Sequence, residues 1–231
     1  MKKYIHHFIL LAFLAITQMV WAQQLTGSGI LRDDELPCLP SHGRNDNVTA
    51  WCGEEIATQT IQFVQGQNWF STNVDIALED LQNALREALP SAGNRTIKIK
   101  SQRNGECTNL PSTWPGSLKV LDVTQMYKIT VPSACEITLE GAPVNPADHP
   151  ITIKNGANWI GFPLLEQMTV TNAFAGFAVK NDVVKSQSLG QAKWNNTIWT
   201  GALKNLVPGQ GYIYQSQATE DRTFTYPSST K

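Results

Sequence analysis

Few side chains in this sequence could carry out catalysis, and no spacing among them matches a known reaction. The 231-residue chain has four histidines, of which His42 and His149 follow the N-terminal segment. A Ser-His-Asp hydrolase would have to use one of these two, and no Gly-x-Ser-x-Gly surrounds a serine. Nineteen acidic residues occur, but no spacing singles out the carboxylate pair of a glycosidase. We therefore predict that the protein is not an enzyme, with a small secreted hydrolase as an alternative.

Metal ligands form no recognisable site either. The stretches DDE (33–35) and NDN (45–47) could together bind calcium through oxygen atoms, but we favour solvated turns for both. No Cys-x-x-Cys or Cys-x-x-His spacing occurs, so zinc is not expected. A glycine-rich phosphate loop is absent as well. We expect neither a metal nor a cofactor.

Tryptophan is the remaining residue type with binding chemistry, because an exposed indole can stack on a ligand ring. Of the six tryptophans that follow residue 22, Trp51 and Trp194 have no counterpart in the repeat described below. A core shared by both copies therefore does not need them. They are our candidate binding residues, for an extracellular glycan or a surface protein.

The N-terminus has the parts of a secretory signal peptide. Basic MKKYIHH precedes apolar FILLAFLAITQMV, and Val20 and Ala22 occupy the small-residue positions before a cut. We predict that residues 1–22 are removed and that the mature protein is secreted to the periplasm, the cell surface or the medium. The unbroken apolar run falls short of the roughly 20 residues that span a bilayer, and no other stretch could span one.

The mature chain would be mildly acidic. Cleavage removes two lysines, which leaves 16 basic against 19 acidic residues. No basic patch is evident that could neutralise phosphates. Nucleic acid is therefore not an expected partner.

The four cysteines of this exported chain suggest two disulfides. Of the three possible pairings we favour Cys38–Cys52 and Cys107–Cys135, since each pair lies within one region. Free buried thiols are the alternative. A bridge that closes a loop of about 28 residues would contribute roughly 3–4 kcal/mol.

The chain contains an internal repeat. The matched stretches are GQNWFS (66–71) with GANWIG (156–161), IKIKSQ (97–102) with DVVKSQ (182–187), WPGSLKVL (114–121) with WTGALKNL (199–206), and MYKI (126–129) with GYIY (211–214). The offset is 90 for the first pair and 85 for the others, which one insertion or deletion of about five residues explains. Four matches in one order indicate a duplicated unit.

Positions kept in both copies are mostly large apolar residues and glycines, which predicts a shared packed core. The kept residues include Trp69/Trp159, Trp114/Trp199, Gly116/Gly201, Leu118/Leu203 and Tyr127/Tyr212. Buried indoles would supply much of the interior of so small a domain. The alternative is that Trp114 and Trp199 are exposed and stack on sugar rings. The kept Asn68/Asn158 pair should bond to backbone in a turn. The kept Lys-Ser-Gln triplets suggest hydrogen bonding at a sheet edge, with a binding role as the alternative.

We predict a mainly β protein with a minor helix in each repeat, built as two small antiparallel barrel-like or sandwich-like domains. The predicted organisation is an irregular segment (23–59), a first β module (60–141), a proline-rich connector (142–150) and a second β module (151–231). The first helix would bury leucines 78, 81, 85 and 89, with Asn73 or Asp75 as its cap and Pro90 as its stop. A helix of one to two turns is expected in TVTNAFAGFAV of the second copy. WNNT (194–197) is expected to form a hairpin turn.

The order Gly-x-Asn-Trp, Trp-x-Gly-x-Leu, Gly-x-Gly-Tyr resembles a GWNW…WxGxL…GxxY module of secreted and surface proteins of Bacteroidetes-like bacteria. The match runs from Thr60 to the C-terminus, and Met126 departs from it by replacing the last glycine before Tyr127. The resemblance implies an extracellular, non-catalytic module. We expect a secreted surface, adhesion or ligand-binding protein, with a carbohydrate-binding protein of a polysaccharide-uptake system as the alternative.

Overall fold

A computed structural model describes residues 55–228, which belong to one compact unit beginning at Glu54. The predicted features that lie outside the described residues are the signal peptide, His42, Trp51, the Cys38–Cys52 bridge and both candidate calcium stretches. Within residues 55–228, no helix is long and apolar enough to cross a membrane.

The first half contains two antiparallel sheets and one helix. Its elements are β1 (Ala57–Phe63), β2 (Gly66–Phe70), β3 (Val74–Asp75), α2 (Leu78–Ala88), β4 (Lys98–Lys100), β5 (Glu106–Thr108), β6 (Tyr127–Val131) and β7 (Cys135–Pro143). The smaller sheet has the order β1-β7-β3 and the larger sheet β2-β6-β4-β5. Buried residues alternate with exposed or half-buried ones along β1 and β6, so each sheet turns one face to the core. The first strand thus begins at residue 57, inside the segment predicted to be irregular.

The second half repeats this plan. Its elements are η2, a short 3-10 helix (Pro146–Asp148), β8 (Ile151–Ile153), β9 (Gly156–Ile160), β10 (Met168–Thr169), α3 (Val170–Ala173), β11 (Val183–Ser186), β12 (Gln191–Trp194), β13 (Trp199–Gly201), β14 (Asn205–Leu206), β15 (Tyr212–Ser216) and β16 (Arg222–Phe224). Its larger sheet has the order β13-β12-β11-β15-β9, and two-stranded sheets join β16 to β8 and β10 to β14. The connector begins later than predicted, because β7 continues to Pro143.

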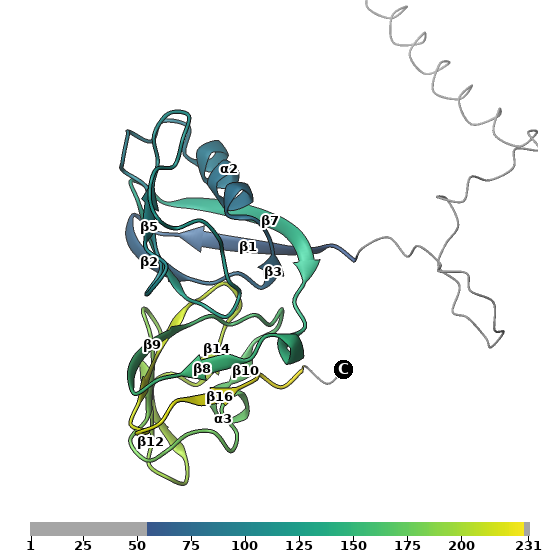
Figure 1. The fold of residues 1–231 in the computed structure, drawn as a ribbon, viewed down its shortest axis with the longest axis vertical. Coiled ribbons are helices and arrows are strands. Elements are labelled where there is room, and N and C mark those ends of the chain that lie inside the picture. Colours follow the sequence, from purple (N-terminus) through teal and green to yellow (C-terminus); the bar gives the residue numbers. More distant parts are fainter. Residues whose placement is uncertain (1–54, 229–231) are drawn as a thin grey trace, which may run out of the picture. The chain divides into compact units, whose positions relative to one another are not determined.

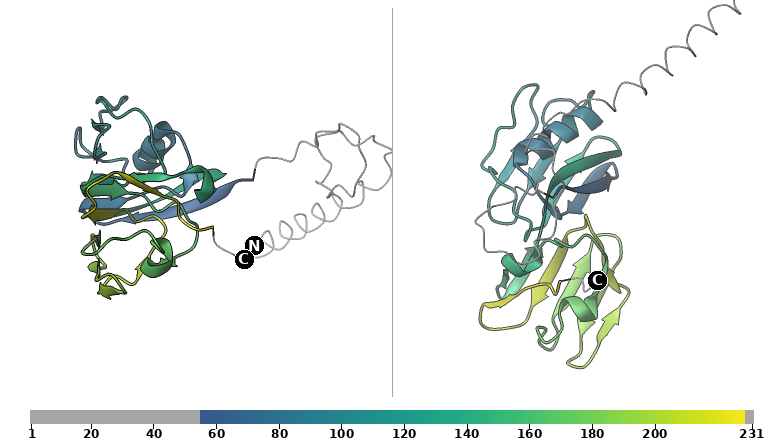
Figure 2. Two further views of the ribbon diagram at one scale, coloured as in Figure 1. Left: turned by 60° about the horizontal axis from the view of Figure 1, so that its bottom comes forward. Right: turned by 90° about the vertical axis from the view of Figure 1, so that its right-hand side faces the viewer.

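The larger sheets of the two halves have the same strand order, since β2-β6-β4-β5 corresponds to β9-β15-β11-β12. In Figure 1 the strands β2, β5, β9 and β12 all lie on the left, and α2 and α3 lie to the right of them. The right-hand view of Figure 2 shows the molecule from the side that carries both helices. The mainly-β class is confirmed, and no sheet among the described residues closes into a barrel.

The predicted helices are present, but the predicted cap of the first is wrong. Helix α2 begins at Leu78, and its first turn is closed by Asp80, whose carboxylate accepts the N–H of Ala77 at 3.0 Å. Asn73 is buried and donates instead to the carbonyl of Leu164 at 3.2 Å. Helix α3 has four residues, as the shorter pattern predicted, and Thr169 caps it.

The predicted turns are confirmed. The Asn68 side chain accepts the N–H of Val64 at 3.0 Å and donates to the Val64 carbonyl at 2.8 Å. Asn158 makes the same two bonds with Lys154. WNNT forms the turn between β12 and β13, where the Asn195 side chain accepts two backbone N–H groups.

The predicted core is correct for the kept leucines and tyrosines and wrong for the tryptophans. Leu118, Leu203, Tyr127 and Tyr212 are all buried. All five tryptophans of the described residues are only half-buried. The first Trp-x-Gly-x-Leu phrase pairs with β5, and the second pairs with β12. Trp114 and Trp199 therefore pack against the two cores while remaining partly exposed.

The predicted Cys107–Cys135 disulfide is also wrong, because both residues are free thiols. Cys107 is buried beneath the larger sheet from β5, whereas Cys135 begins β7 of the other sheet, opposite Phe63. The Cys107 sulfur lies 3.8 Å from the side-chain amide of Gln82. Burial raises the pKa of both thiols, which favours their less reactive neutral form.

Tyr127 and Tyr212 each anchor the loop that leads into their strand. The phenol oxygen of Tyr127 accepts the N–H of Asp122 at 2.7 Å, and that of Tyr212 accepts the N–H of Val207 at 2.6 Å. Burial raises the pKa of each phenol from 10.0 to about 12. A phenolate at either position would lose much of its solvation.

These two phenols predict a loss of stability at alkaline pH. The unfolded chain releases their protons from about pH 10 and the folded chain only near 12, so the stabilisation is complete below pH 10 and is lost between these values. Each phenol should contribute roughly 2–3 kcal/mol to this loss. Urea unfolding from about pH 8 to about pH 12 would measure it. Tyr212→Phe should flatten the decline, and an unchanged urea midpoint across this range would contradict the prediction.

Candidate functional site

The kept Lys-Ser-Gln triplets place their glutamines at the seam, the surface along which the two halves meet. The Gln102 side chain, just after β4, accepts the N–H of Trp159 at 2.7 Å and donates to the carbonyl of Ala157 at 2.7 Å. Strand β9 is the edge of its sheet, so these backbone groups have no strand neighbour on that side. The glutamine amide therefore takes the place of one peptide group of an adjacent strand.

Gln187 makes the matching contact in the opposite direction. Its side chain accepts the N–H of Trp69 at 2.6 Å and donates to the carbonyl of Gln67, both on the edge strand β2. The donors and acceptors are the same as in the Gln102 contact, with the halves exchanged. The edge role predicted for the triplets is thus confirmed, and it joins the two halves reciprocally.

Further backbone contacts across the seam follow the same approximate twofold relation. They comprise the isolated bridges Phe70–Gln210 and Gln125–Ile160, and hydrogen bonds from Ser71 N–H to the Gly209 carbonyl at 3.2 Å and from Gly161 N–H to the Thr124 carbonyl at 2.8 Å. Each contact pairs the end of an edge strand with the loop that precedes β6 or β15. The two modules therefore pack directly on one another.

Two matched clefts lie along the seam. Cleft 1 has a volume of about 600 Å³ and cleft 2 a volume of about 140 Å³. Cleft 1 is lined by β1 and β2 together with residues 187–188 and 208–211 of the other half. Cleft 2 is lined by β8 and β9 together with residues 102–104 and 124–125. Of these two matched clefts, cleft 1 is the one with the volume of a typical small-molecule site.

Cleft 1 combines an indole with uncharged polar groups. Trp69 lines it, and no ionisable side chain occurs among its described lining residues. Thr60 and Ser188 supply hydroxyl groups, and Gln62 and Gln210 supply amides. This composition suits an uncharged ligand that has both an apolar face and hydrogen-bonding groups.

The matched cleft is not chemically equivalent. Arg103 of cleft 2 occupies the position that Ser188 holds in cleft 1, by the 85-residue offset. Cleft 2, which contains the long cationic side chain of Arg103, is also much smaller than cleft 1. The two copies therefore differ in charge as well as in size at this site.

Trp69 and Trp159 approach the same lysine at the seam. The Lys128 Nζ lies 5.1 Å from the ring centroid of Trp69 and 4.3 Å from that of Trp159. These distances allow a cation–π contact with each ring. Burial and the neighbouring Lys100 lower the pKa of Lys128. A single side chain of the first half thus links the indoles of both halves.

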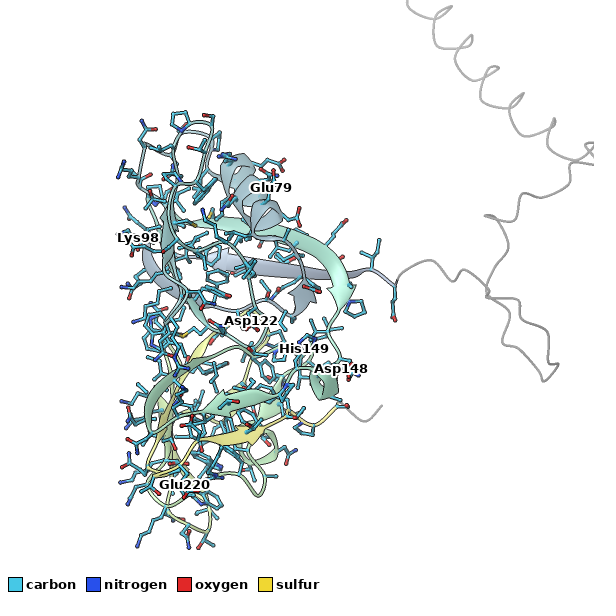
Figure 3. All side chains as sticks on the ribbon, in the orientation of Figure 1. Glu79, Lys98, Asp122, Asp148, His149 and Glu220 are labelled. Atoms are coloured by element: carbon cyan, nitrogen blue, oxygen red, sulfur yellow. The ribbon has the colours of Figure 1, made fainter. Side chains whose placement is uncertain are left out.

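The two sequence-predicted functional residues that the structure describes, Trp194 and His149, are not in the clefts. Trp194 lies opposite Trp199 across β12 and β13, with ring centroids 5.5 Å apart, and it lines neither cleft. His149 follows η2 in the connector, and Figure 3 shows it and Asp148 on the side of the molecule away from Lys98. Among the described residues, no group of three His, Cys, Asp or Glu could hold a metal ion.

The sequence did contain a signal for the indoles that the structure brings together. Trp69 and Trp159 each stand between buried residues of an alternating strand, which places them on the outward face. Their occurrence in both copies suggested a core position instead. Alternation with the buried asparagine before each of them was the better indicator.

Comparisons with family models, with curated proteins and with solved structures found no significant match to this chain.

Proposed function

We propose that this chain is a secreted, non-enzymatic ligand-binding protein that holds a neutral carbohydrate in cleft 1. The observation that carries the proposal is the neutral lining of this cleft beside Trp69. A sugar offers an apolar C–H face to an indole and hydroxyl groups to amides. Cleft 1 provides both kinds of partner within one volume of about 600 Å³.

The sequence adds support for an extracellular role. The predicted signal peptide would export the chain, and the resemblance to modules of secreted and surface proteins implies a non-catalytic part. A glycan-binding protein at the cell surface could serve in adhesion or in polysaccharide capture. Both uses need binding without turnover.

Filling cleft 1 should remove binding. Ser188 is exposed at the cleft, so Ser188→Tyr adds a ring there without disturbing the core. The affinity for a neutral oligosaccharide, first identified on a glycan array and then titrated calorimetrically, should fall at least about tenfold. The thermal midpoint should stay close to that of the wild type.

The matched control is Arg103→Tyr, which adds the same ring at the equivalent position of cleft 2. Cleft 2, at about 140 Å³, is too small for a sugar, so this variant should bind like the wild type. Equal weakening by both variants, or binding by Ser188→Tyr at full affinity, would show that cleft 1 is not the site.

A further inference from the structure

The outward faces of the two larger sheets carry a concentration of lysine. The charged residues at outward strand positions are Lys98, Lys100, Glu106, Lys128, Lys185 and Lys193. Five lysines thus accompany one glutamate, in a chain whose formal net charge is −1. We call this surface the outer face. Figure 3 labels Lys98 on the left-hand side, where Figure 1 shows the strands of both larger sheets.

Strand register arranges the centre of the outer face as one row. In the first half Lys100 lies opposite Lys128, which lies opposite Trp69. In the second half Lys185 lies opposite Ile213, which lies opposite Trp159. Directly opposed residues of antiparallel strands project to the same face, and each half-row spans two strand spacings, or about 10 Å.

The two half-rows meet at their tryptophans. The contact of Lys128 with both indoles shows that Trp69 and Trp159 lie side by side at the seam. The row therefore has two half-exposed rings at its centre and one kept lysine, Lys100 or Lys185, toward each end. Repetition of the Lys-Ser-Gln and Asn-Trp motifs produces this symmetry.

The charge of the outer face is only partly neutralised. Glu106 forms an ion pair with Lys98 at 3.2 Å and also lies opposite Lys100. Within the described residues Lys100, Lys128 and Lys185 take part in no ion pair. The lowered pKa of Lys128 reflects burial and repulsion by Lys100, and a bound anion would relieve that repulsion.

We infer that the outer face binds an acidic polysaccharide, with Trp69 and Trp159 stacked on sugar rings and the row lysines paired with carboxylates. This site goes beyond the neutral cleft: it shares Trp69 with cleft 1 but adds Trp159 and the row lysines, none of which lines that cleft. Its ligand must be extended, since the row crosses both halves. Carboxylates on successive sugars would meet lysines at separated points of the row.

A single-stranded nucleic acid also offers rings and negative charge, but the predicted export favours a polysaccharide. Cleavage of the signal peptide expected in residues 1–22 would place the chain outside the cell. Nucleic acid is therefore kept as an outcome of the test.

The test uses the mature chain with polygalacturonate, a polymer of uronic acid. The wild type should bind it, and the affinity should fall with rising salt, because exposed ion pairs are screened over about 10 Å at 0.1 M. Lys100→Gln with Lys185→Gln should weaken binding about tenfold or more. Dextran, a neutral polymer, should not bind the row.

The charge-matched control is Lys119→Gln with Lys204→Gln, a second kept pair of exposed lysines that lies outside the strands of the outer face. It should change the affinity by less than about twofold. No binding of polygalacturonate, equal weakening by the control, or tighter binding of single-stranded DNA would each overturn the inference. The Lys100/Lys185 variant should keep its affinity for a neutral oligosaccharide, so failure of this site and failure of cleft 1 remain distinguishable.

Discussion

Gly201→Ala is expected to lower the free energy of unfolding by about 3–5 kcal/mol. A methyl group at this position would overlap the carbonyl oxygen of Gln191 and come within 3.2 Å of the Ala192 Cα. Both obstacles are backbone atoms of β12, the strand that pairs with Gly201, so no side-chain rotation can relieve them. The backbone φ of +135° adds strain for any L side chain.

Gly156→Ala is the matched control for this prediction. Gly156 also has a positive φ, +86°, but a methyl group there meets nothing within 4 Å. Its cost should be that of the backbone conformation alone, about 1 kcal/mol. Urea unfolding of the wild type, Gly201→Ala and Gly156→Ala separates the cost of the steric overlap from the cost of the backbone conformation. Equal losses for both variants would mean that close packing is not what requires Gly201.

The same geometry explains why the Trp-x-Gly-x-Leu phrase occurs twice. A methyl group on Gly116 would overlap the Glu106 carbonyl oxygen and lie 2.6 Å from the Cys107 Cα. In each copy the glycine thus brings the phrase against the neighbouring strand, and the leucine two residues later enters the core. The phrase is repeated because each copy needs a glycine for this close approach and a leucine for its core, while the tryptophan packs partly exposed at the edge of that core.

Local patterns predicted the elements of this fold well. Leucine spacing located α2, and strict alternation located β1 and the paired strands, because each pattern reflects burial of one face. The turn asparagines were also predictable, since their bonds reach only two to four residues along the chain. Residues 57–59 were assigned to the irregular segment, because the polar side chains of Thr58 and Gln59 conceal an edge strand.

The seam could not be predicted in the same way. Its hydrogen bonds join residues far apart in the sequence, such as Gln102 with Trp159, 57 positions apart, and Gln187 with Trp69, 118 positions apart. The Lys-Ser-Gln triplets kept in both copies indicated that these polar residues have a role, but the sequence did not show which residues they contact. The Cys107–Cys135 error has a similar origin, since proximity in sequence did not reveal that different sheets hold the two thiols.

Met126 is the departure of the first copy from the shared motif, and Gly211 is its counterpart in the second copy. The two residues face each other across the seam. A methyl group on Gly211 would overlap Met126 Cγ, lie 2.7 Å from Met126 Cβ and lie 2.9 Å from the Phe70 carbonyl oxygen. Met126 is fully buried. Matched positions that meet near an approximate twofold axis leave room for one side chain, so one copy carries methionine and the other glycine.

A double-mutant cycle at these positions should show strong coupling between the halves. Gly211→Ala should cost about 3 kcal/mol from the clash, and Met126→Gly about 2–5 kcal/mol from the cavity and lost burial. The double variant should be more stable than the sum of the two losses predicts, by at least about 2 kcal/mol, because removal of the methionine side chain clears the two closest contacts. Chemical unfolding of the four proteins gives the coupling energy.

Residual contact with the Phe70 carbonyl should keep the double variant below the stability of Met126→Gly alone. The control cycle combines Met126→Gly with Gly156→Ala, which has open space around it, and should be additive within about 0.5 kcal/mol. Additivity in the first cycle would mean that Met126 does not contact Gly211 in solution, and the seam would then not bring the two modules together. Coupling would show that the two halves meet at the seam, as cleft 1 and the row of the outer face both require.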